Sequence, residues 1–138
     1  MYAVLTDGGR ILLMRRAGSG YHDGELGLPA GHLDGGEDAV SGLVRELREE
    51  LTIEADPDSC ALATVLHRAA EPSGGPEYVD LVFTVGRWQG TVAIGEPAKC
   101  GELVWADRDA LPADVVPYIR TTLDALHAGE RLVLIGWT

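Results

Sequence analysis

The sequence contains little of what several large protein classes require. Its two cysteines, Cys60 and Cys100, lie far apart and lack the spacing of a zinc site or a disulfide framework, so we expect buried thiols in a reducing compartment. No apolar run is long enough to cross a bilayer. The first residues also lack the basic and long apolar segments of a secretory signal. These absences predict a cytoplasmic protein.

Positive charge is also scarce. The chain has 11 lysines and arginines against 22 aspartates and glutamates, which gives a formal net charge of −11. This excess argues against a nucleic-acid backbone or an anionic membrane surface as the partner. If the chain binds a polyphosphate, cations must neutralise the site.

Neither an internal repeat nor a dividing linker interrupts the 138 residues, of which 46% are apolar. Length and composition therefore predict one domain spanning residues 1–138. Apolar patterning predicts strands at 2–5, 10–15, 61–67, 78–85, 91–94, 102–105 and 131–137, and helices after Asp38 and over 114–127. Strands interspersed with two helices indicate an α/β fold, with a mixed sheet between helices.

The most informative segment, 31–53, places a glycine-rich turn directly before an amphipathic helix. Asp38 stands where its carboxylate can accept hydrogen bonds from the first free amides of that helix. The apolar face follows the spacing of three and four that is typical of a helix packed on a core, at Val40, Leu43, Val44, Leu47 and Leu51.

The opposite region of this helix is acidic. Glu46, Glu49 and Glu50 are close neighbours on a helix, and each like-charged i,i+4 pair costs roughly 0.2–0.5 kcal/mol. A divalent cation would offset that repulsion, and carboxylate oxygens suit magnesium, manganese or calcium better than zinc. The alternative is a solvated helix face with ordinary ion pairs, in which Arg45 braces Glu49.

The same segment resembles the Nudix box, the motif of the Nudix hydrolases. The match consists of Gly31, Glu37, Arg45, Glu46, Leu47, Glu49, Glu50 and Ile53, all in register. The departure is Thr52, where the family usually has glycine. The sequence therefore does not define how the helix ends, but the carboxylates are unaffected. Weaker similarity covers 12–16, 28–31, 102–105 and 110–112. The resemblance implies a Nudix α/β/α sandwich.

The resemblance also implies chemistry: Nudix enzymes hydrolyse a nucleoside diphosphate linked to another group, using Mg²⁺ or Mn²⁺. It assigns metal ligation to three carboxylates and one backbone carbonyl, namely Glu46, Glu49, Glu50 and Ala30. Arg45 is expected to orient the carboxylates, with Glu37 as its partner across the loop. The number of metal ions stays open.

A further acid from a late loop usually assists in this family as a ligand or base. Glu96 and Glu102 are the candidates, and we favour Glu96 because it lies in the loop 95–99 whereas Glu102 opens a strand. Residues that could hold phosphates or stack on a base are Arg15, Arg16, Arg68, Tyr21, Tyr78, Trp88 and Tyr118, although core packing is the alternative for each aromatic. His22 and His32 flank the expected site.

The sequence thus favours a metal-dependent pyrophosphohydrolase. Its expected substrate is a small nucleoside triphosphate, oxidised or not, cleaved to nucleoside monophosphate and pyrophosphate. A second hypothesis replaces this substrate with ADP-ribose, a nucleotide sugar or a non-nucleotide diphosphate. A third is a nucleotide-binding module without turnover. The substrate, and whether the chain is a monomer or a homodimer, stay open.

Overall fold

The first strand, β1 (Tyr2–Asp7), lies inside a mixed sheet because side chains on both of its faces are apolar. It pairs in parallel with β6 and antiparallel with β2. Val4 belongs to one buried cluster, while Ala3 and Leu5 point the other way into a second cluster. The sheet therefore has an apolar core on each side.

The computed structural model describes all residues 1–138. The elements after β1 are β2 (Arg10–Arg16), β3 (Leu26–Gly27), α1 (Ala39–Leu51), β4 (Glu54–Ala55), η1 (Pro57–Ser59), β5 (Cys60–Arg68), β6 (Tyr78–Val85), β7 (Trp88–Gln89), β8 (Cys100–Asp107), α2 (Pro117–His127) and β9 (Leu132–Ile135). The main sheet has the order β3-β2-β1-β6-β5-β9, with β8 on the other edge of β2, and β4 pairs with β7 separately. No helix is long and apolar enough to cross a membrane.

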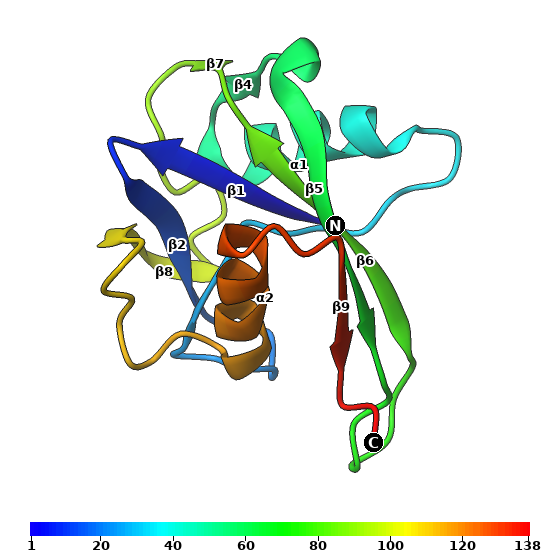
Figure 1. The fold of residues 1–138 in the computed structure, drawn as a ribbon. Helices are drawn as coiled ribbons and strands as arrows, with labels where there is room; N and C mark the ends of the chain where they lie inside the picture. The colour runs from blue at the N-terminus through cyan, green and yellow to red at the C-terminus, as the bar shows by residue number, and fades with distance from the viewer.

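The two helices lie on opposite sides of the main sheet (Figure 1). Leu43, Leu47 and Leu51 of α1 are buried against β1 and β6. Ile119 and Leu123 of α2 are buried in the other cluster. The predicted α/β/α arrangement with a mixed sheet is confirmed, and burial of these helical stripes is what holds the layers together.

The strands β1 and β2 separate along their length, and this separation lets the loop before α1 lie between them. Next to their turn the two strands pair at Thr6–Ile11, but farther along β2 pairs with β3 instead. The chain after β3 then fills the gap, because the Ala3 N–H donates to the Pro29 carbonyl at 2.9 Å. This path brings Ala30 beside the start of β1 and close to α1.

Both ends of α1 follow from single residues. The Asp38 carboxylate accepts a hydrogen bond from the Ser41 N–H at 2.9 Å, which confirms the predicted N-cap. Thr52 ends the helix in the left-handed region, with φ of 59°, and its N–H donates to the Arg48 carbonyl. Threonine thus adopts the conformation for which glycine is the usual residue.

Two sequence predictions of local structure were wrong. Residues 91–94 form no strand, because the backbone there docks on the end of α1: the Ala93 N–H donates to the Leu51 carbonyl at 3.0 Å. The second helix begins at Pro117 and not at 114, since a proline disfavours helical backbone in the preceding residue and itself suits the first helical position. The other predicted strands are confirmed, with small shifts of their ends.

Candidate functional site

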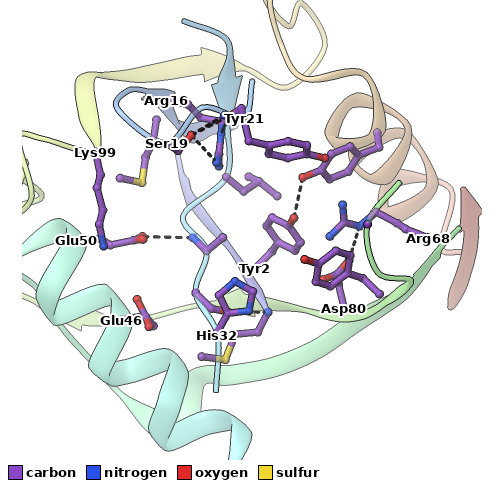
Figure 2. A pocket seen from close by; sticks show the side chains of 18 of the residues that line it. Tyr2, Arg16, Ser19, Tyr21, His32, Glu46, Glu50, Arg68, Asp80 and Lys99 are labelled. Carbon is purple, nitrogen blue, oxygen red and sulfur yellow. Dashed lines mark hydrogen bonds and ion pairs between the residues drawn. The ribbon is translucent and has the colours of Figure 1, made fainter. Parts of the chain in front are cut away.

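A cleft of about 720 Å³ opens beside the end of α1. One end is lined by Glu46, Glu50 and Glu96, and the other by Arg68 and Asp80. Figure 2 shows these two ends facing each other across Tyr2 and His32. The cleft therefore joins the acidic part of α1 to side chains from the central strands.

Two carboxylates from α1 face this cleft with little solvent. Burial, followed by the charge of Glu46, raises the pKa of Glu50 to about 8. A hydrogen bond from the Ala30 N–H acts in the opposite direction and lowers it. The Glu46 side chain is only 15% exposed. Such a pair of partly desolvated acids is costly unless a positive charge joins them.

Gly31 leaves room for the Glu46 side chain where the loop passes α1. A Cβ atom at this position would lie 2.1 Å from Cδ of Glu46, closer than any real contact. Without a side chain at position 31, the Glu46 carboxyl group lies directly against the loop backbone. The first glycine of the motif thus has a steric role that the sequence alone did not indicate.

Arg45 holds the loop and the helix together. Its Nη2 and Nε donate to the two oxygens of Glu37 at 2.7 and 3.0 Å, and its Nη1 donates to Glu46 Oε1 at 2.9 Å. Nη2 also donates to the His32 carbonyl. These hydrogen bonds, first the ones to Glu37 and then the one to Glu46, raise the pKa of Arg45. The predicted Arg45–Glu37 pair is confirmed, and Glu49 lies farther off at 3.4 Å from Nη1.

The loop 95–99 brings a further acid to the cleft. The Gly95 N–H donates to the Glu50 carbonyl at 2.8 Å, and a Cβ at Gly95 would lie 2.1 Å from the Glu49 carbonyl oxygen. This close approach places Glu96 in the cleft lining, with Lys99 Nζ at 3.3 Å from its Oε2. Glu102 does not line the cleft, because Arg15 binds it on β2.

The donor set fits a hard divalent cation. Glu46 and Glu50 supply carboxylate oxygens, and the Ala30 carbonyl oxygen accepts no hydrogen bond within the protein. In the arrangement seen here, no three acidic, histidine or cysteine side chains converge on one point. Glu49 is half exposed and does not line the cleft, so it would join a metal only after its side chain turns inward. All of these atoms are oxygens, as magnesium and manganese prefer.

The other predicted binding residues divide into two groups. Arg16, Arg68, Tyr21, Tyr78, Tyr118 and His32 line the cleft. Arg15, His22 and Trp88 do not line it: Arg15 binds Glu102 and Asp114, His22 binds Glu25, and Trp88 pairs with β4.

Sequence reasoning missed two residues at the far end of the cleft. Asp80 binds Arg68, with Oδ2 at 2.6 Å from Nε, and the Tyr2 hydroxyl lies 2.9 Å from that of Tyr118. A signal for Asp80 was present, since a lone acid interrupts the apolar run 78–85. A carboxylate in a buried strand needs a partner or a function.

Comparison with known proteins agrees with this geometry. The family model described as NUDIX domain matches residues 1–126. A crystal structure of a MutT NUDIX hydrolase from Burkholderia pseudomallei is 28% identical, with a TM-score of 0.80 over 89% of this chain and 92% of that chain. The solution structure of the E. coli ORF135 protein is 29% identical, with a TM-score of 0.74 over 92% of this chain and 86% of that one.

A crystal structure of a MutT protein from Methanosarcina mazei Go1 shares the fold at 21% identity. Its TM-score is 0.76, over 92% of this chain and 90% of that chain. A search of curated proteins found no match to this sequence.

Proposed function

Because the chain belongs to the Nudix family and is a pyrophosphohydrolase of that family, we propose that it hydrolyses a nucleoside triphosphate to nucleoside monophosphate and pyrophosphate with Mg²⁺ or Mn²⁺. Hydrolysis of a nucleoside diphosphate linked to another group is the general reaction of the family. The observation that carries the proposal is the pair of half-buried acids, Glu46 and Glu50, at one end of a cleft of about 720 Å³.

The site residues take distinct roles in this proposal. Glu46, Glu49, Glu50 and the Ala30 carbonyl would hold the cation. When bound, the cation neutralises phosphate charge and lowers the pKa of a bound water. Arg45 is a positioning residue, because its guanidinium fixes Glu46 against the loop through Glu37. Phosphoryl transfer asks the protein mainly for such positioning and charge stabilisation.

Glu96 is proposed as the general base, whose carboxylate takes the proton of the attacking water. It faces the cleft on a loop that is tied to the end of α1, and Lys99 keeps a positive charge beside it. Arg16 at the same cleft is proposed to bind phosphate oxygens, because it makes no ion pair with a protein acid. We place this activity in the cytoplasm, in one domain spanning residues 1–138.

Product analysis on a substrate panel tests the proposal. The panel contains nucleoside triphosphates, oxidised triphosphates, ADP-ribose and nucleotide sugars, each incubated with Mg²⁺ and with a chelator. We expect Mg²⁺-dependent release of a monophosphate, fastest from a triphosphate. A faster reaction with ADP-ribose or a nucleotide sugar would contradict the proposed substrate, and no turnover on any member would contradict the proposed activity.

A further inference from the structure

The end of the cleft away from the acids contains an ion pair with unused hydrogen-bonding capacity. The side chains of Arg68 and Asp80 are 12% and 8% exposed, and a single contact joins them, from Arg68 Nε to Asp80 Oδ2. Arg68 donates no other hydrogen bond, and Asp80 Oδ1 accepts none. Both residues line the cleft, as Figure 2 shows. The free donors of Arg68 and the free Oδ1 of Asp80 therefore border the open cleft, where a ligand can pair with both.

The register of β5 and β6 places this ion pair beside aromatic side chains. Leu66 faces Asp80 and Arg68 faces Tyr78 across β5 and β6, so the charged side chains are diagonal neighbours on one face. The Arg68 guanidinium carbon lies 4.6 Å from the ring centre of Tyr78 and 4.5 Å from that of Tyr118. The ion pair is thus bordered by flat rings that line the same cleft.

Charge decides which part of a substrate fits here. Asp80 neutralises Arg68, so the ion pair itself offers no net positive charge to a phosphate. The nearby Met1 ammonium group donates to the Gly31 carbonyl. What this end of the cleft offers is a guanidinium donor next to a carboxylate acceptor, together with aromatic faces. The edge of a nucleobase supplies the complement, since each base has a ring or carbonyl acceptor next to an N–H donor, and a flat ring that stacks.

We propose that Arg68 and Asp80, with the rings of Tyr78 and Tyr118, form the nucleobase-binding end of the cleft and read the base edge. Arg68 donates to the base acceptor, and Asp80 Oδ1 accepts from the adjacent base N–H. This assignment rests on the proposed function, in which the substrate is a nucleotide. It places the phosphates toward Glu46 and Glu50 and favours nucleotides over diphosphates that lack a base.

Binding of reaction products tests this assignment without turnover. Calorimetric titration measures the Kd of GMP, AMP, CMP and UMP, and of ribose 5-phosphate as a probe without a base. We expect the best nucleotide to bind at least about tenfold more tightly than ribose 5-phosphate. In Asp80→Asn the ratio of Kd values between the poorest and best base falls about tenfold, because the amide offers a donor where the carboxylate accepted. The Kd of ribose 5-phosphate stays unchanged.

A second variant keeps the test decisive if the loss of a buried charge unfolds Asp80→Asn. Tyr78 is 36% exposed, so Tyr78→Ala leaves the core intact, and it weakens all four nucleotides about tenfold but not ribose 5-phosphate. Glu54→Gln serves as the control, because Glu54 pairs with Arg48 outside the cleft. Equal binding of ribose 5-phosphate and nucleotides, base ratios unchanged in a folded Asp80→Asn, or nucleotide Kd values unchanged in Tyr78→Ala, would overturn the assignment.

The two proposals fail in different ways. If the substrate panel shows no turnover while the base preference and its loss in Asp80→Asn hold, the proposed reaction is wrong and the base site stands. If monophosphates are released but Asp80→Asn keeps the base ratios and Tyr78→Ala keeps the nucleotide Kd values, the reaction stands and the base site is wrong.

Discussion

Arg45 and Glu37 form a two-point ion pair that spans the turn into α1, with distances of 2.7 Å from Nη2 to Oε1 and 3.0 Å from Nε to Oε2. The remaining Nη1 of the same guanidinium donates to Glu46. The loop and one cleft carboxylate are therefore held by a single planar group, which a lysine cannot imitate.

We predict that Arg45→Lys lowers kcat/KM between about 10- and 100-fold, the range typical when a residue that orients metal ligands is lost. The Mg²⁺ concentration that gives half the maximal rate should rise as well, because Glu46 loses its fixed orientation. Steady-state rates over a Mg²⁺ titration measure both effects. Arg48→Lys on the same helix, whose partner Glu54 is exposed, is the matched control. Equal Mg²⁺ dependence in the two variants would argue against the positioning role.

Neutralising the acids of α1 should remove activity without removing the fold. Glu49→Gln and Glu50→Gln are each expected to lower kcat on the order of 10²- to 10³-fold, because electrostatic stabilisation at the reacting phosphate is lost. Neither side chain belongs to an apolar cluster, so the melting temperature should stay within a few degrees. Activity close to wild type in both variants, measured at saturating Mg²⁺, would refute the metal assignment.

The two late acids should differ in effect. Glu96 lines the cleft, whereas Glu102 is held by Arg15 on β2. Glu96→Gln should therefore lower kcat at least about tenfold, within the range for loss of a general base, and Glu102→Gln should leave kcat nearly unchanged. The pair forms its own control, since both changes remove one charge from the same part of the chain. A larger loss in Glu102→Gln would show that Glu102 is the functional acid.

The left-handed backbone of Thr52 at the end of α1 leads us to predict that glycine at this position stabilises the fold. A left-handed residue with a side chain costs roughly 1–2 kcal/mol, and glycine regains most of this despite its greater freedom in the unfolded chain. Thr52→Gly should thus raise the free energy of unfolding by about 1 kcal/mol. Urea unfolding followed by circular dichroism measures the change. Thr52→Asn, which tolerates the same conformation better than threonine, should lie between the two. A glycine variant less stable than wild type would show that the weak contact from Thr52 Oγ1 to the Thr91 carbonyl outweighs the strain.

The parts of this molecule that the sequence predicted are mostly local. The apolar stripe of α1 and the Asp38 cap depend on residues close in the chain, so spacing was enough. The Arg45–Glu37 pair was implied by the resemblance to the Nudix box. The alternation of apolar residues likewise indicated most strands, because burial of both sheet faces leaves a pattern in the sequence.

The parts that the sequence did not predict depend on contacts between distant residues. Residues 91–94 form no strand because their backbone bonds to the end of α1, which short-range patterning cannot show. Asp80 meets Arg68 only through the register of β5 and β6. The steric role of glycine at position 31 comes from Glu46, whose side chain lies against the loop.

The central claim is that the acidic end of the cleft supports metal-dependent cleavage of a nucleoside triphosphate. Phosphorus NMR of the wild-type protein with a triphosphate, in Mg²⁺ and then in excess chelator, tests it most directly because it identifies the bond that breaks. We expect pyrophosphate and nucleoside monophosphate to appear in Mg²⁺ and to stop appearing in chelator, and Glu50→Gln to resemble the chelated sample. Orthophosphate and nucleoside diphosphate as products, or an unchanged rate in chelator, would contradict the claim.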